Sequence, residues 1–294
     1  MQSREDSTTD SLGRAIDGAI TGDERPLFAL LARASGLPGV RVNDAIVSAF
    51  ASHCATRGRR ADALVRRMVL LDADRAPGGT ELEILPVCGV AALGARIVSD
   101  AKMKALGSTS LELLEAAAED LRFRVRDEVP KALSRIGAVR GESLLEDVAG
   151  WMDGLFQAAA VLLAAADNAW LSQIAQPGVL VVRMGQAFTL AREADRATER
   201  YPGYKALLDA LSTTPGVFAA RFGAPVFDAM VGWTTVKEPK LRDVISSALS
   251  GTRLSKRFGS DVARVRLALA STAPVRRDPS TDVGRTRGRG RKVR

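Results

Sequence analysis

The chain has 294 residues and a formal net charge of +8, and 46% of its residues are hydrophobic but only 5% are aromatic. That hydrophobic share is sufficient for a continuous core. The shortage of aromatic residues argues against a β-sandwich, in which β-branched and aromatic residues are common. Two cysteines and one histidine exclude a disulfide framework and any metal site that needs two imidazoles.

The N-terminal third of the chain predicts a polar segment followed by helices. The first ten residues, MQSREDSTTD, have almost nothing to bury, so we expect residues 1–10 to be disordered. Asn43 is a predicted N-cap, because its side chain can accept a hydrogen bond from the first helical turn. The helices expected in this part cover residues 11–20, 26–35, 44–57 and 60–74.

Glycine and proline punctuate the rest of the chain. The run Ala76-Pro77-Gly78-Gly79 ends the preceding helix, and helices are expected over residues 81–99 and 109–120. Ser143 and Glu146 have the spacing of a capping box. The Pro-Gly steps of the C-terminal half, which predict short connections in a helix-turn-helix array, are Pro177-Gly178, Pro202-Gly203 and Pro215-Gly216.

Two short runs rich in branched apolar residues leave an alternative open. Residues 67–71 and 179–184 have the composition of buried strands in an α/β fold. Both runs lie inside longer segments with helical spacing, and no alternating partner strand follows within reach of a hairpin. We therefore predict that both are helical.

The most regular segment is residues 120–137, DLRFRVRDEVPKALSRIG. Its apolar side chains recur at helical spacing and form one stripe, while charged side chains cover the opposite face. Such a helix needs a partner along its whole apolar side, and in a chain with few strand signals that partner must be another helix. The stripe consists of Val125, Val129, Ala132, Leu133 and Ile136.

The same segment resembles the second half of a HEAT repeat, an armadillo-type α-helical repeat. A poorer copy surrounds Leu241, at 116 residues from Val125, and a third candidate has Ala92-Leu93 at 40 residues before Ala132-Leu133. These offsets agree with the period of about 40 residues in HEAT and armadillo arrays. The residues that carry the resemblance are Asp120, Val125, Arg126, Ala132, Leu133, Ile136 and Gly137, with Leu241, Arg242, Ala248 and Leu249 in the poorer copy.

The resemblance implies an all-α fold, a right-handed α-solenoid of HEAT-like helix pairs with disordered N- and C-terminal tails. The repeat domain would cover residues 11–272, between the segment 1–10 and a basic Arg-Gly tail at residues 273–294. The alternative is an irregular helical domain, because an Ala- and Leu-rich helical protein of no repeat family can produce similar matches.

Most of the positive charge lies in the tail. Residues 276–294 contain eight basic and two acidic residues, and alternating Gly and Arg cannot pack a core but can bind phosphates. The tail therefore predicts association with nucleic acid, DNA or RNA; a purely solubilising role is the alternative. The predicted contacts are Arg285, Arg287, Arg289, Arg291, Lys292 and Arg294 in the tail, and Arg253, Lys256 and Arg257 near a helix end.

A weaker resemblance links the chain to HEAT-like DNA glycosylases of alkylation repair, which hold a cationic lesion with tryptophans and an aspartate. It rests on the repeat signature and on the C-terminal stretch PKLRDVISSALSGTRLSKRF. In such an enzyme, Trp151, Asp153 and Trp233 would be the site residues. The alternative is that these tryptophans belong to the core or to the edge of a groove.

No catalytic motif is present. The only histidine, His53, is adjacent to Cys54, and neighbouring side chains in a helix point about 100° apart, so the two side chains do not face each other. We therefore expect no cofactor, no metal and buried, reduced thiols. The polar start does not resemble a secretory signal, and the apolar run 155–166 is too short to cross a bilayer, so we expect a cytoplasmic protein with no membrane partner.

The main prediction is a non-enzymatic helical-repeat protein that binds a macromolecule, nucleic acid being favoured by the basic faces and the tail. Base excision from alkylated DNA and a protein–protein scaffold are the alternatives. An exposed apolar groove rather than a basic one would indicate the scaffold.

Overall fold

The structure is a computed structural model that describes residues 2–102 and 108–273, with side chains over residues 11–100 and 109–273. Every element in these ranges is helical, which confirms the all-α prediction and the helical assignment of residues 179–184, part of α11. The first α-helices are α1 (Gln2–Ile20), α2 (Arg25–Ala34), α3 (Asp44–Arg57), α4 (Asp62–Val69), α5 (Ile84–Lys102), α6 (Ser108–Ala118), α7 (Phe123–Arg140) and α8 (Ser143–Asp147). The remaining ones are α9 (Leu155–Ala166), α10 (Asn168–Leu171), α11 (Gly178–Glu193), α12 (Pro202–Phe222), α13 (Ala224–Trp233), α14 (Pro239–Ala248), α15 (Thr252–Arg257) and α16 (Gly259–Ser271).

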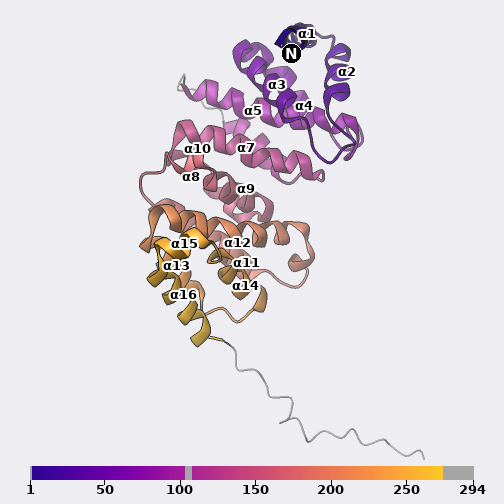
Figure 1. The fold of residues 1–294 in the computed structure, drawn as a ribbon. Coiled ribbons are helices and arrows are strands. Elements are labelled where there is room, and N and C mark those ends of the chain that lie inside the picture. Colours follow the sequence, from indigo (N-terminus) through magenta and orange to yellow (C-terminus); the bar gives the residue numbers. More distant parts are fainter. Residues whose placement is uncertain (1, 103–107, 274–294) are drawn as a thin grey trace, which may run out of the picture.

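Six helices form a continuous row, each packed on the one before it: α3, α5, α7, α9, α12 and α14. Other helices form a second layer on the row. In that layer α4 packs on α5, α6 on α5 and α7, α10 on α7 and α9, α11 on α9 and α12, and α13 on α12 and α16. Figure 1 shows the result, with the helices following the chain from the N-terminal end at the top to the C-terminal end at the bottom.

The row helices begin along one edge of the molecule, here named the starting edge. Charged contacts join neighbouring helices in the N-terminal part of the row. Arg124 at the start of α7 places Nη1 at 2.9 Å from Oε2 of Glu83, the residue before α5. Asp44 at the start of α3 accepts from Nζ of Lys131 on α7, across α5, at 2.9 Å. These pairs fix α3, α5 and α7 as parallel neighbours.

Aromatic and cationic contacts continue along the starting edge. The guanidinium of Arg126 on α7 lies 4.4 Å from the ring centroid of Phe156 on α9. That ring in turn meets Tyr201, the residue before α12, edge to face at 5.4 Å. Lys240 on α14 lies 5.7 Å from the centroid of Tyr204 on α12. The starts of α7, α9, α12 and α14 therefore lie side by side as well.

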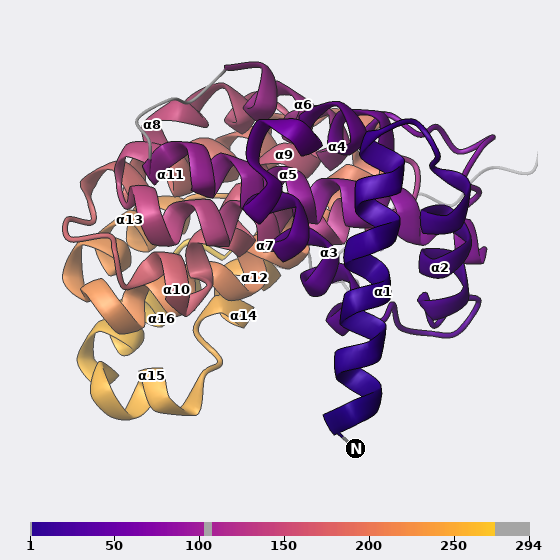
Figure 2. The same ribbon diagram turned by 90° about the horizontal axis from the view of Figure 1, so that it is seen from above.

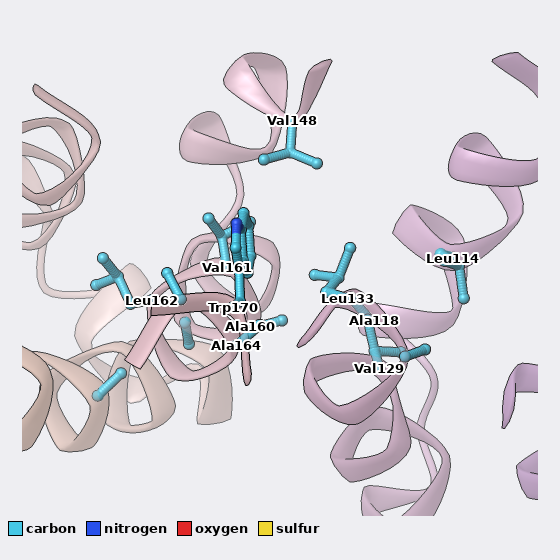
Figure 3. Close-up of a cluster of buried hydrophobic side chains, with 14 of the residues drawn as sticks. Leu114, Ala118, Val129, Leu133, Val148, Ala160, Val161, Leu162, Ala164 and Trp170 are labelled. Atoms are coloured by element: carbon cyan, nitrogen blue, oxygen red, sulfur yellow. The ribbon is translucent and has the colours of Figure 1, made fainter. Parts of the chain in front are cut away.

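The core runs the length of the row. Every residue from 83 to 94 is buried, so α5 has almost no face in contact with solvent. The segment Glu81–Asp100 has the length and apolar composition of a membrane-spanning helix, and 78% of its most apolar window is buried inside the protein. Figure 3 shows how Leu114 and Ala118 of α6, Leu133 of α7 and Trp170 of α10 continue the core toward α9.

Glycines allow the closest approaches between helices. A Cβ at Gly94 on α5 would lie 2.8 Å from the Cβ of Ala132 on α7, and one at Gly137 on α7 would lie 2.1 Å from a ring atom of Trp170. The ring of Trp170 is fixed in addition by a hydrogen bond of 2.9 Å from Nε1 to the carbonyl oxygen of Gly141. The Gly at the end of the HEAT-like segment is thus required by packing.

Some helix caps agree with those predicted from the sequence, and others differ. Asn43 caps α3 as predicted, since its side chain accepts from the amide of Ile46. The capping box predicted at Ser143 is wrong: no side chain caps α8, and Ser143 Oγ donates to the carbonyl oxygen of Arg140 at 2.9 Å. The chain turns after α7 at Gly141, so Ser143 is already helical.

Three predicted boundaries differ from those in the structure, and tertiary packing explains the one in α12. The sequence predicts a break at Pro215-Gly216, but α12 continues through it. This segment is packed against α14, since a Cβ at Gly216 would lie 2.3 Å from the carbonyl oxygen of Ala248. Disorder is predicted for residues 1–10, but α1 begins at Gln2, so the helix expected over residues 11–20 extends toward the N-terminus. The predicted 60–74 helix ends at Val69.

The close contact at Gly137 can be tested by Gly137→Ala. Because the ring of Trp170 occupies the space of the new methyl group, we expect the free energy of unfolding to fall by about 1–3 kcal/mol. Gly185→Ala is the matched control, since nothing lies within 4 Å of its Cβ position on α11. There we expect a gain of about 0.5–1 kcal/mol. Urea unfolding of the three proteins measures both changes, and equal stabilities would contradict the packing role of Gly137.

Candidate nucleic-acid interface

The predicted basic residues Arg253, Lys256 and Arg257 lie on α15, a short helix between α14 and α16. All three side chains are exposed, while Leu254 is buried and attaches the helix to the core. Phe258, which follows α15, packs on Phe227 with ring centroids 5.6 Å apart. Figure 2 shows α15 projecting at the rim of the molecule. The three cations are therefore presented to solvent from an anchored helix.

A fourth cation, Arg221 at the end of α12, completes this surface. Arg257 Nη1 donates to the carbonyl oxygen of Ala220 at 3.3 Å, which brings α15 beside Arg221. Arg221 itself donates from Nη2 to the carbonyl oxygens of Ser172 and Ile174, at 3.2 and 3.1 Å. The sequence did not single out Arg221, because only tertiary contacts place it near α15. The α15 patch is defined here as Arg221, Arg253, Lys256 and Arg257.

The α15 patch keeps its positive charge. Over residues 11–100 and 109–273, no carboxylate lies within 4.0 Å of any of its four cationic groups. The nearby carboxylates Asp228 and Asp261 are engaged by a different cation, Arg264, at 2.7 and 3.2 Å. A phosphate approaching α15 would therefore meet unneutralised charge.

A second set of basic residues lies at the end of α3 and along α4: Arg57 and Arg67 have carboxylate partners, whereas the exposed Arg59, Arg60 and Arg66 have none within 4.0 Å among the described residues. Arg57 makes an ion pair with Asp17 at 2.7 Å and also donates to the carbonyl oxygen of Gly13, so it joins α3 to α1. Arg67 pairs with Glu24 at 2.6 Å. These arginines hold helices together, which makes them weaker candidates for phosphate binding than the α15 patch.

The three residues of the glycosylase alternative are placed in different settings. Trp151 is 3% exposed and belongs to the core, whereas Asp153 is exposed. Trp233 stacks on Phe188 with ring centroids 4.3 Å apart and planes 1° from parallel. Among the described residues no hydrogen bond or ring contact joins the three. The base-excision alternative stays a prediction.

The pair His53 and Cys54 lacks the features of a nucleophile and its base. Cys54 is fully buried, and desolvation raises the pKa of its thiol to about 12, the opposite of an activated thiolate. His53 places Nδ1 at 3.3 Å from Nη1 of Arg57. Burial likewise raises the pKa of Cys88 well above its usual range. In the part of the chain that the structure describes, no group of three or more His, Cys, Asp or Glu side chains is arranged to hold a metal.

Burial of both thiols predicts their reactivity. Near pH 8 the native protein should release almost no thionitrobenzoate from Ellman's reagent, because the thiolate forms only at much higher pH. In concentrated urea both cysteines should react at the rate of a model thiol. Rapid reaction of one equivalent under native conditions would show that one of the two thiols is accessible.

No family model, curated protein or solved structure matches this chain. The fold and the site alone therefore define the class: an all-helical protein whose described residues form a parallel row of helices with an unneutralised basic surface near the C-terminal end.

Proposed function

We propose that the chain is a non-enzymatic HEAT-like repeat protein that binds nucleic acid through the α15 patch and the Arg-Gly tail. The observation that carries the proposal is the absence of any described carboxylate within 4.0 Å of the four cations of the patch. Phosphate is the ligand that such a surface favours, since each bound phosphate releases condensed counterions. The tail, outside the described residues, would add further arginines.

The spacing of the row supports the repeat architecture. Its helices begin at residues 44, 84, 123, 155, 202 and 239, on average about 40 residues apart, as in HEAT and armadillo arrays. Each row helix has a partner in the second layer between it and the next, except where α8 to α10 divide that layer into short pieces. In this proposal the row and the second layer are the two helices of successive HEAT-like pairs in a right-handed solenoid.

The positions of patch and tail support a joint surface. α16 follows α15 directly and has 13 residues, so about 20 Å separates the patch from the start of the tail. The 21 residues beyond Ala273 can extend over about 70 Å. Patch and tail can thus contact the same strand or duplex, with the tail raising the local concentration of positive charge.

The patch is tested by the triple variant Arg253→Gln, Lys256→Gln, Arg257→Gln in fluorescence anisotropy titrations of labelled DNA and RNA. We expect the plot of log affinity against log salt, between about 50 and 200 mM, to become shallower by about 3 units, because three phosphate contacts are lost. The affinity at the lower salt should fall at least about tenfold.

The matched control replaces three exposed arginines with no described ion pair at the other end of the molecule: Arg25→Gln, Arg33→Gln, Arg75→Gln. It removes the same charge, so an equal loss of affinity would mean that net charge alone, and not the α15 patch, governs binding.

The tail is tested separately by replacing Arg285, Arg287, Arg289 and Arg291 with glutamine in the full chain. Because non-specific phosphate contacts should be lost, we expect weaker binding to every sequence and a smaller salt dependence. Affinity unchanged by this variant, at equal helix content, would remove the tail from the binding surface.

A further inference from the structure

An apolar groove opens between the C-terminal ends of α4 and α6 in the second layer. Its volume is about 310 Å³, and its apolar lining includes Val69, Leu71, Leu113 and the two strongly exposed side chains Leu70 and Leu121. Leu70 is 57% exposed and Leu121 is 87% exposed. An occupant of the groove would remove the apolar surface of these two leucines from water.

The rim of the groove is acidic. Residues 70–76 and 112–122 contain six carboxylates and two guanidinium groups. One of these, Arg122, is only 5% exposed and pairs with Asp120 at 2.5 Å. Among the described residues no cationic group lies within 4.0 Å of the side-chain carboxylates of Asp72, Glu115 or Glu119. Burial, together with the like charges of Glu112 and Glu119, raises the pKa of Glu115, as expected for an acidic surface without counter-charge.

The groove has a fixed floor, so it does not depend on an occupant for its shape. Arg122 Nη2 donates to the carbonyl oxygen of Leu71 at 2.7 Å, and Nη1 donates to those of Asp72 and Ala76 at 3.1 and 3.0 Å. One buried guanidinium thus binds the loop after α4 to the loop before α7. The carbonyl ends of α4 and α6 add the negative ends of two helix dipoles.

We propose that this groove is the docking site of the chain's own basic tail, residues 274–294. Charge complementarity carries the assignment, since the tail holds eight basic and two acidic residues whereas the rim of the groove is acidic. Arginine side chains can lay their aliphatic stems along apolar surface while the guanidinium reaches the carboxylates. The apolar lining and the acidic rim therefore fit one type of side chain, the one that dominates the tail.

The geometry of the fold permits docking within one molecule. The last turn of α16 lies at the starting edge, because Arg242 at the start of α14 donates from Nη1 to the carbonyl oxygens of Val236 and Thr272, at 3.0 and 3.4 Å. The groove lies at the same edge, beside the start of α7. From α7 to α14 there are three packing steps, about 30 Å in all, which is well within the reach of 21 residues, about 70 Å.

Docking of the tail does not require the nucleic-acid function proposed above, but it would affect how the tail binds nucleic acid. Arginines held in the groove are withdrawn from phosphates until nucleic acid competes for them. The tail would then be shared between an acidic surface of its own chain and an external polyanion.

The test is energy transfer within the full chain carrying Arg75→Cys beside the groove and Val293→Cys near the end of the tail, labelled with donor and acceptor dyes. The native thiols are buried and leave these two sites for labelling. Without nucleic acid, we expect transfer at low salt to exceed that at about 1 M salt at least about twofold, because salt screens the attraction.

The variant Asp72→Asn, Glu115→Gln, Glu119→Gln should lower the low-salt transfer to its high-salt value. The control variant Asp23→Asn, Asp209→Asn, Asp243→Asn removes the same charge from exposed positions elsewhere and should leave transfer unchanged. The double variant Leu70→Ser, Leu121→Ser should lower transfer as well. It measures the contribution of the apolar lining to docking separately from that of the acidic rim. Surface changes of this kind shift stability little, and circular dichroism verifies that each variant keeps its helix content.

Three results would overturn the proposal. The first is transfer that is equal at low and high salt. The second is an equal loss in the rim variant and its control. The third is transfer that arises only when singly labelled chains are mixed, which would assign the tail to the groove of a second copy. Because no nucleic acid is present, each result is independent of whether the α15 patch binds phosphate.

Discussion

The contact between α5 and α7 brings two helix backbones together at Gly94, where a single added carbon would meet the methyl group of Ala132 at 2.8 Å. So close an approach leaves no space for solvent, and α5 is covered by α2, α3, α4, α6 and α7. A helix buried on all sides can carry almost no polar group. Arg96, a buried charged residue within α5, is paired with Asp62 and Asp100 at 2.8 and 3.0 Å, and other charged pairs join neighbouring helices of the row.

The charged side chains of the structure have two different kinds of partner, carboxylates and backbone carbonyl oxygens. Along the starting edge, Glu83 with Arg124 and Asp44 with Lys131 use their charges to fix the register of the row. Glu128, 2% exposed, is neutralised by Lys131 and Arg135, although burial still raises its pKa. In the α15 patch, Arg221 and Arg257 donate to carbonyl oxygens, and none of the four cations has a carboxylate partner among the described residues. Basic residues that join helices, such as Arg124 and Lys131, therefore differ from those of the α15 patch in having carboxylate partners.

The sequence predicts most of the helices because apolar spacing is a local property. It predicts α2, α3 and α7 closely, and Asn43 as a cap, since each depends on residues within a turn or two of one another. It also names Arg253, Lys256 and Arg257, which are adjacent in the chain. Arg221 was missed because it reaches α15 only through packing of α12. The groove between α4 and α6 was not predicted either, as two loops fifty residues apart form it around Arg122.

Packing also explains the predictions that were wrong. A proline with a glycine ends many helices, yet α12 continues through Pro215 because α14 covers this stretch and Gly216 admits the carbonyl of Ala248. The cap expected at Ser143 is lost because the turn at Gly141 already lets the next helix begin. Local sequence patterns indicate where a helix can begin or end, and packing against neighbouring helices determines which of these boundaries the structure adopts.

The burial of most of α5 has a consequence for biosynthesis. Translation proceeds at about 5–20 residues per second, so α5 leaves the ribosome seconds before α7, which must cover it, has been made. During that interval a nascent helix with the length and hydropathy of a membrane span has no partner on one side. The cell must protect this intermediate from aggregation or from mistaken insertion, and chaperone engagement should therefore concentrate on residues 84–102.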